Sequence, residues 1–307
     1  MDDKTRIAAS VHARLLNKAR ESAGRPFMEL LQYYGMEKFL LRLSRSEYAK
    51  EFILKGALLL RTTGISEIRP TRDIDLSRET AQTIEELEGM VRVCCQIDVE
   101  EDGLTFEPDT VKGEEIREDQ AYKGVRIKFL GKLGSAQIPM QIDIGFGDVV
   151  SPSPLWVEYP VLLDGDSPNL LAYTLESAIA EKYQAMVYLD MANSRMKDFY
   201  DIWYLMGNQR FEGSKLQKAI EQTFHRRKTK LPNEPPTAIT ETFFSDDSKK
   251  TQWGAFKRKA EMDDESATLE VVVKNIYDFL WPLHESLNNG EEFVSIWKPE
   301  KGWGKRN

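Results

Sequence analysis

The chain contains little cysteine and little histidine. Its 307 residues include two cysteines, the neighbours Cys94 and Cys95, and three histidines that lie far apart. Adjacent cysteines without partners elsewhere cannot form a disulfide framework, and scattered histidines do not have the spacing of a zinc site. We therefore expect both cysteines to be buried packing residues, and we exclude a disulfide-stapled scaffold and a cysteine–histidine metal centre.

The sequence also lacks long hydrophobic runs. No apolar stretch approaches the roughly 20 residues that a membrane-spanning helix needs. The first residues, MDDKTRIAAS, do not have the basic and then apolar profile of a signal peptide. With 41% hydrophobic and 30% charged residues, the composition is typical of a folded globular protein. We expect a cytoplasmic protein with no membrane partner.

The chain has no overall excess of positive charge. Its net charge of −8 argues against indiscriminate binding to nucleic acid. Basic residues are nevertheless concentrated in the segment SKLQKAIEQTFHRRKTK, residues 214–230, which contains a single acid, Glu221. Most runs of this kind are solvated surface. We take the segment as a candidate patch for a polyanionic partner.

The pattern of apolar residues predicts two domains. Residues 4–49 have apolar positions three and four apart, which indicates helices, and the chain then alternates short apolar segments with glycine-containing turns. We predict an α/β (α+β) domain with a mixed sheet at 1–160 and a helical domain at 161–307. Within the first domain we expect a helix at 79–95 and strands at 52–55, 73–77, about 97–106, 124–130 and 138–145.

Asp73 and Asp75 lie in an apolar context, in the segment RDIDLS. Residues two apart in a strand project from the same face, so the two carboxylates point together and repel each other. Such a pair is costly without a cation, and Mg²⁺ prefers oxygen ligands of this kind. The tripeptide alone is a weak signal, because most such motifs are solvated loops.

A later hairpin offers a third acid. In GVRIKFL and IPMQIDIGFG, apolar residues alternate so that Ile142 and Ile144 face the core, which leaves Asp143 on the opposite face. If this strand lies beside Asp73 and Asp75, three carboxylates from two strands make a two-metal site conceivable. Two ions can activate an attacking hydroxyl and hold a triphosphate.

Lys55 and Gly56 interrupt the apolar segment FILKGALLL. A strand that ends in a glycine turn and leads into a helix presents backbone N–H groups to phosphate oxygens, and glycine permits a close approach. Lys55 adds positive charge there, although a lysine at a strand end can also simply extend into solvent.

The predicted helical domain has its own polar cluster. Lys182 lies in TLESAIAEKYQAMVYLD, and Asp198 and Asp201 share a helix face in SRMKDFYDIWYLM because they are three residues apart. Acid pairs at this spacing are usually solvated. Here an aromatic stripe follows Lys197, so we expect a well-packed helix whose acids are not fully exposed.

Together these segments resemble a known family. The similarity spans about residues 10–205, and it is carried by the ordered motifs MEKFLLRLSRSEYAKEFILKGALLL, RPTRDIDL, QIDIGFGD, TLESAIAEKYQAMV and RMKDFYDIW. They resemble the AbiEii/AbiGii toxin family of nucleotidyltransferases. The resemblance implies a DNA polymerase β-type nucleotidyltransferase core with N-terminal helices and a helical C-terminal domain. It also implies a toxin of a toxin–antitoxin and phage-defence (abortive infection) system, with a cognate antitoxin encoded nearby.

The resemblance assigns roles to residues of this sequence. It implies a nucleotide-binding motif at Lys55, Gly56 and Ala57. Many related enzymes have Gly-Ser or Gly-Gly there, so Ala57 keeps the backbone N–H but lacks a hydroxyl contact. The other implied roles are metal binding and catalysis by Asp73, Asp75 and Asp143, catalysis by Lys182 and Asp198, and nucleotide binding by Lys182, Lys197 and Asp201.

The resemblance implies a Mg²⁺-dependent enzyme that binds two ions. It would transfer a nucleoside monophosphate from an NTP to an RNA acceptor, the tRNA 3′ end, and so block translation. Two alternatives stay open at this point. The acceptor could be a protein or a small molecule, or the fold could bind nucleotide or a partner without turnover.

Overall fold

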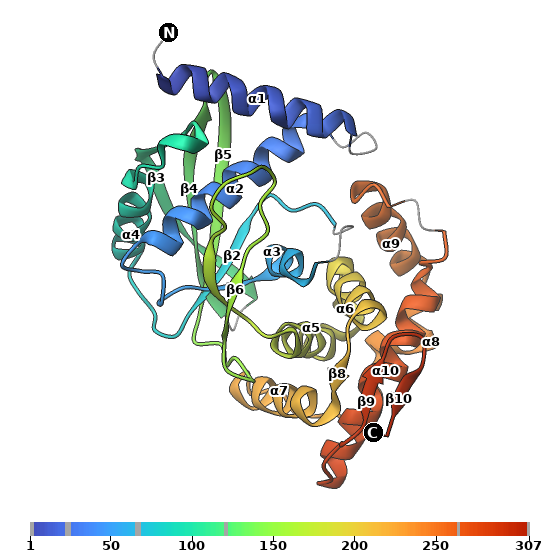
Figure 1. The fold of residues 1–307 in the computed structure, drawn as a ribbon. Coiled ribbons are helices and arrows are strands. Elements are labelled where there is room, and N and C mark those ends of the chain that lie inside the picture. Colours follow the sequence, from blue (N-terminus) through green and yellow to red (C-terminus); the bar gives the residue numbers. More distant parts are fainter. Residues whose placement is uncertain (1–2, 22–25, 65–68, 120–121, 263–264, 306–307) are drawn as a thin grey trace. The chain divides into compact units, whose positions relative to one another are not determined.

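The computed structural model describes residues 3–21, 26–64, 69–119, 122–262 and 265–305 (Figure 1). The chain divides into two compact units: Met1–Asp148 with Leu155–Ala172, and Val149–Pro154 with Tyr173–Asn307. The predicted boundary between residues 160 and 161 falls inside the segment that returns to the first unit. No helix in the described ranges is long and apolar enough to span a membrane.

A seven-stranded mixed sheet forms the centre of the first unit, which therefore has an α/β architecture. Its strand order is β3-β4-β5-β2-β1-β7-β6. β2 pairs with β5 and β1 with β7 in parallel, and the other neighbours are antiparallel. The strands are β1 Ile53–Lys55, β2 Ile74–Arg78, β3 Leu104–Asp119, β4 Tyr122–Leu133, β5 Ala136–Phe146, β6 Leu155–Glu158 and β7 Asn169–Ala172.

The apolar face of this sheet packs against helix α2, Phe27–Arg45. Ile74, Ile142 and Ile144 are buried, as the predicted alternation requires. Gly35 of α2 lies so close to β5 that an added Cβ would be 3.2 Å from the sulfur of Met140. The opposite face of the central strands is left for polar residues.

The remaining helical elements of the first unit are short or peripheral. They are α1 Asp3–Glu21, α3 Gly56–Leu60, η1 Arg61–Thr63, α4 Ile84–Gln96 and η2 Glu100–Asp102. The prediction of a helix from residue 79 was wrong at its start, because Thr83 forms a capping box with Glu86 and the helix begins at Ile84. The strand predicted from 97 begins at Leu104, because the η2 turn precedes it.

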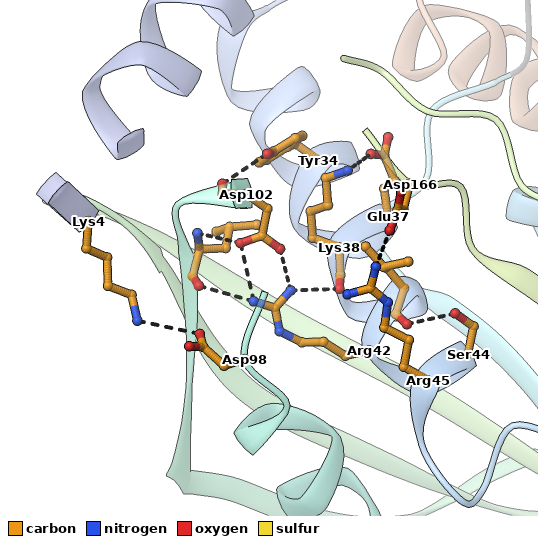
Figure 2. A network of polar contacts seen from close by, with 12 residues as sticks. Lys4, Tyr34, Glu37, Lys38, Arg42, Ser44, Arg45, Asp98, Asp102 and Asp166 are labelled. Atoms are coloured by element: carbon orange, nitrogen blue, oxygen red, sulfur yellow. Dashed lines mark hydrogen bonds and ion pairs between the residues drawn. The ribbon is translucent and has the colours of Figure 1, made fainter. Parts of the chain in front are cut away.

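A buried polar network ties α2 to the start of β3 (Figure 2). Arg42 Nη1 donates to Asp102 Oδ2 at 2.6 Å, and its Nη2 donates to the carbonyl oxygen of Leu104 at 3.2 Å. Tyr34 donates its hydroxyl to the Asp102 carbonyl oxygen. The charged side chains of Arg42 and Asp102 are both buried, so each needs the other as a partner. The network fixes how α2 crosses the sheet.

The second unit is mainly helical, as predicted, with a small sheet that the sequence pattern did not predict. The sheet has the order β10-β9-β8. The elements are α5 Leu175–Leu189, η3 Asp190–Ala192, α6 Met196–Asn208, β8 Phe211–Glu212, α7 Gly213–Arg226, η4 Thr237–Ile239, α8 Glu241–Ser245, α9 Asp247–Lys259, α10 Leu269–Asn289, β9 Ile296–Lys298 and β10 Gly302–Gly304.

The core of the second unit lies between α5, α7 and α10. Tyr183, Phe224 and His284 are all buried there, and Tyr183 and His284 share a hydrogen bond of 3.0 Å between the hydroxyl oxygen and Nδ1. His284 Nε2 lies 2.7 Å from the carbonyl oxygen of Pro232. This packing holds α5 firmly, which matters because α5 carries Lys182.

Candidate functional site

Four charged residues form one row across the centre of the first sheet. Lys55 on β1 pairs with Asp75 on β2, Asp75 pairs with Asp143 on β5, and Asp143 pairs with Arg126 on β4. Residues paired in this way project from the same face of a sheet, with neighbouring strands about 4.8 Å apart. The predicted approach of Asp143 to Asp75 is confirmed by this register. The row has two acids in the middle and a base at each end.

Asp73 belongs to the same electrostatic cluster. It lies just before β2, two residues before Asp75, and its side chain is partly buried. The hydrogen bond from Arg126 to Asp143 raises the pKa of Arg126 above its usual value, and the charges of Asp143 and Asp73 raise it further. Asp73 is therefore close enough for Arg126 to respond to its charge.

Arg126 holds Asp143 in a bidentate ion pair. Arg126 Nε donates to Asp143 Oδ1 at 2.8 Å, and Arg126 Nη2 donates to Asp143 Oδ2 at 2.7 Å. Sequence reasoning did not single out Arg126. A signal was available, since the two-residue turn after Leu133, with Gly134 at φ +59°, fixes the hairpin register that pairs Arg126 with Asp143.

Gly56 lies directly against Asp75. Its φ is +69°, a conformation that favours glycine, and a Cβ added there would lie 1.9 Å from Asp75 Oδ2. Any larger residue would displace the carboxylate. The glycine thus brings the backbone at the start of α3 next to the acidic pair, and Ala57 follows as the next residue with a buried side chain. α3 has only five residues, so its helix dipole is small. The close approach of the backbone to Asp75 therefore contributes more to the site than the dipole does.

Lys55 has a partner that the sequence reasoning missed. Its ammonium lies 3.1 Å from Asp148 Oδ2, and Asp148 is largely buried. The lysine passes over Gly145, where an added Cβ would be 3.2 Å from Nζ. The glycine on β5 therefore makes room for the lysine of β1, and Asp148 fixes the position of its charge.

The donor set fits a hard divalent cation only in part. Asp75 on β2 and Asp73 just before it offer carboxylate oxygens, which are ligands that suit Mg²⁺. Within the described residues, however, no three His, Cys, Asp or Glu side chains converge in a way that would hold a metal ion. The carboxylate of Asp143 is bound by another partner, because Arg126 donates hydrogen bonds to both of its oxygens. The two-ion centre remains a prediction.

The predicted polar cluster of the second unit forms as a compact ion network. Lys182 on α5 donates to Asp198 Oδ1 at 2.9 Å and to Asp201 Oδ2 at 2.7 Å, both on α6. The two aspartate side chains are 1% and 0% exposed, and Lys182 is 13% exposed. Lys197 is exposed on the same helix. The structure thus brings together three of the four predicted residues.

The electrostatics of this network are dominated by positive charge around Asp198. Burial alone would raise the pKa of Asp198, but the charges of Lys182, Arg195 and Lys197 outweigh it and hold the pKa far below its usual value. Arg195 Nε donates to Asp198 Oδ2 at 2.6 Å. Asp198 is therefore a permanently charged group at neutral pH, and it orients Lys182 and Arg195.

A second set of contacts anchors the basic segment to α5. Arg227 Nη1 donates to Gln184 Oε1 at 2.9 Å, and its Nη2 lies 3.4 Å from Glu181 Oε1. Tyr173 donates its hydroxyl to the same Glu181 oxygen at 3.0 Å. Because Glu181 precedes Lys182 in the chain, the basic turn after α7 is held beside the helix that carries the Lys182 network.

The solved structures similar to this chain include two from one organism. A crystal structure of JHP933 from Helicobacter pylori has a TM-score of 0.42 and 14% sequence identity, over 85% of this chain and 97% of that chain. A second H. pylori chain, described as a provisional nucleotidyltransferase, has a TM-score of 0.40 and 12% identity, over 86% and 98%. No curated protein matches this chain.

A family model gives a clear match. The model is described as nucleotidyl transferase AbiEii toxin, type IV toxin–antitoxin system, and it matches residues 38–281, which include parts of both units. The class of protein is therefore a nucleotidyltransferase. The chain belongs to the AbiEii toxin family of type IV toxin–antitoxin systems, as its sequence motifs predicted. Membership implies a nucleoside triphosphate substrate and a cognate antitoxin.

Proposed function

We propose that this chain is a cytoplasmic, Mg²⁺-dependent toxin that transfers a nucleoside monophosphate from an NTP to the 3′ end of tRNA. A tRNA so modified cannot be aminoacylated, which blocks translation and serves phage defence. The observation that carries the proposal is the charged row. In this row Asp75 and Asp143 lie side by side on neighbouring parallel strands, and Gly56 packs against Asp75. Family membership supports the nucleotidyl transfer itself.

In this proposal the first unit binds the triphosphate and the attacking hydroxyl. Asp73 and Asp75 would hold divalent ions, which neutralise phosphate charge and make the 3′-hydroxyl a better nucleophile when bound. Asp143 is the residue we assign to the 3′-hydroxyl, whose proton a carboxylate oxygen would accept. The backbone N–H groups at Gly56 and Ala57 would donate to phosphate oxygens.

Lys55 has a supporting part in the proposed site. Its ammonium, fixed by Asp148, adds positive charge next to Asp75 in the row. A fixed positive charge stabilises phosphate oxygens as charge develops in the transition state, because no reorganisation is needed at that moment.

We assign the polar network of the second unit to the nucleotide as well. Lys182 would neutralise phosphate charge, and Asp198 would orient Lys182. The hydrogen bonds that Asp198 accepts from Lys182 and Arg195 support this role. Lys197 and Asp201 would complete nucleotide binding. This assignment rests on the family resemblance and on the burial of Asp198 and Asp201.

The proposed test is transfer of label from each of the four NTPs to separate pools of tRNA, protein and small molecules, with and without Mg²⁺. We expect label in tRNA only when Mg²⁺ is present, and loss of transfer in Asp73→Ala. Label in protein but never in RNA would contradict the tRNA acceptor. A variant Asp73→Ala that still arrests growth fully would show that catalysis is not the function.

A further inference from the structure

Asp143 is a heavily hydrogen-bonded acid of the charged row. Besides the two bonds from Arg126, its Oδ1 accepts a bond from Gln141 Nε2 at 3.3 Å. A carboxylate offers about four acceptor positions in all. Three of them are therefore used by protein donors, and little of the Asp143 carboxylate is left for any other ligand.

The Arg126 pair is well placed to be strong. The side chain of Asp143 is 11% exposed and that of Arg126 is 31% exposed, so water screens the pair only in part. The planar guanidinium matches the carboxylate with two parallel bonds, a geometry that lysine cannot provide. The hairpin register also places the two residues opposite each other, so only their side chains have to be ordered for the contact to form.

We propose that Arg126 is a positioning residue that restrains Asp143 and competes with a divalent cation for its carboxylate. The inference rests on the proposed function, since it concerns the same site. In the resting protein, Asp73 and Asp75 supply the carboxylates for the cation, and Asp143 is withheld by Arg126. Asp143 joins them only when Arg126 gives up at least one of its two bonds.

The restraint by Arg126 predicts the direction in which the affinity for a cation changes. Removing Arg126 both frees the third carboxylate and removes a positive charge from the site, so a cation should bind more tightly. An opposite charge within about 4–6 Å lowers the pKa of an acid by about 1–3, which is about a tenfold to thousandfold change in its affinity for a proton, and a competing metal cation meets the same opposing charge. A residue that only stabilised the sheet would give the reverse, because a disturbed site binds cations more weakly.

The test is a titration of the full-length protein with Mn²⁺, followed by electron paramagnetic resonance, with neither nucleotide nor RNA present. The variants are Arg126→Gln, Arg126→Lys and Asp143→Asn, with Arg126→Gln also made in the Asp143→Asn background. The matched control is Lys128→Gln. Lys128 lies two residues from Arg126 on the same face of β4, and its exposed ammonium pairs with Glu114 at 2.6 Å.

We expect Arg126→Gln to bind Mn²⁺ about tenfold more tightly than the wild type. Arg126→Lys keeps the charge but cannot donate two parallel hydrogen bonds to Asp143. Its Mn²⁺ affinity should therefore lie between those of the wild type and Arg126→Gln. Lys128→Gln should change the affinity far less, and in the Asp143→Asn background Arg126→Gln should have no more effect than Lys128→Gln. Circular dichroism checks folding, and if Arg126→Gln does not fold, Arg126→Lys carries the comparison.

Unchanged or weaker Mn²⁺ binding in the folded Arg126 variants would overturn the proposal. So would an equal gain in Lys128→Gln, because the effect would then be general charge and not release of Asp143. Failure of the proposed function gives a different result: the wild type would transfer no nucleotide to tRNA, whatever the Mn²⁺ affinities. The two failures are therefore distinguishable.

Discussion

At the scale of single residues, the contact between Gly56 and Asp75 makes the sharpest prediction. Gly56→Ala should lower the rate of nucleotidyl transfer about a hundredfold or more. The new Cβ would displace the carboxylate of Asp75, which the proposed site uses to position a divalent cation. The measurement is the single-turnover rate at saturating NTP. Retention of full activity would contradict the role given to this contact.

Gly64 provides the matched control for that substitution. Its φ is +74°, close to that of Gly56, but among the described residues no atom outside its chain neighbours lies within 4 Å of the position of an added Cβ. Gly64→Ala should therefore carry only the left-handed backbone penalty, about 1–2 kcal/mol of unfolding free energy. Its transfer rate should stay that of the wild type, which separates backbone strain from displacement of Asp75.

The two cysteines give a second prediction at this scale. Burial raises the pKa of Cys94 to about 11 and that of Cys95 to about 12, so almost no thiolate exists at pH 8. Both thiols should react with a thiol-specific reagent such as DTNB at least about a hundredfold more slowly in the folded protein than in denaturant. Fast reaction of the folded protein would show that the pair is accessible.

Sequence reasoning at the residue level found the acids but not their partners. Alternation in the strand placed Asp143 on the polar face, because a period of two is independent of neighbouring strands. Arg126 was missed although the hairpin register pairs it with Asp143, and Asp148 was missed because its role depends on which strands are adjacent and on where a loop returns. Strand order is a property of the whole sheet, and a single strand does not encode it.

At the scale of secondary-structure elements, the contact between α5 and α6 depends on a buried charge. Asp198→Asn should lower the free energy of unfolding at pH 7 by about 3–5 kcal/mol, because Lys182 and Arg195 lose a buried partner. Chemical denaturation measures this. Asp247→Asn is the control, since Asp247 is fully exposed beside Lys250 and should cause no measurable change.

The pH dependence of the Asp198→Asn effect follows from the lowered pKa. The folded protein holds the pKa of Asp198 far below its value in the unfolded chain, which is about 3.9. Its stabilising contribution is therefore complete above about pH 4 and declines as the pH falls below that value. The stability difference between wild type and Asp198→Asn should shrink in that range, and a difference that grew instead would contradict the assignment.

Element prediction was most successful where the apolar pattern was long. The helices of the first 49 residues and the hairpin of β4 and β5 were predicted because several periods were visible. The strands β6 to β10 have two to four residues each, too few to show a period, and they were not predicted. β7 pairs with β1, and β8 pairs with β9, and these partners are far away in the chain, so local sequence does not report them.

At the scale of the whole molecule, binding of an acceptor RNA should depend on local and not overall charge. The protein carries a net charge of −8, yet Arg226 at the end of α7 is exposed, as are Lys228 and Lys230 in the turn after it. We predict that tRNA affinity falls at least about tenfold between 50 and 200 mM salt. A gel-shift titration at several salt concentrations measures it, and an affinity that does not change with salt would exclude phosphate contacts.

Charge reversal locates the contacts. The double variant Lys228→Glu/Lys230→Glu should weaken tRNA binding and reduce the salt dependence, because two phosphate contacts are lost. Lys250→Glu, a reversal of an exposed lysine on α9, serves as the control. Equal weakening by both would show that general charge, and not the turn after α7, determines binding.

The central claim is that the acids of the charged row bind the divalent cations of a nucleotidyl transfer reaction. Anomalous diffraction from crystals that contain Mn²⁺ and a non-hydrolysable NTP tests it most directly. We predict a peak in contact with carboxylate oxygens of Asp73 and Asp75 and with the triphosphate, with Asp143 turned from Arg126 towards it. A bound nucleotide whose Mn²⁺ lies away from Asp73 and Asp75 would contradict the account.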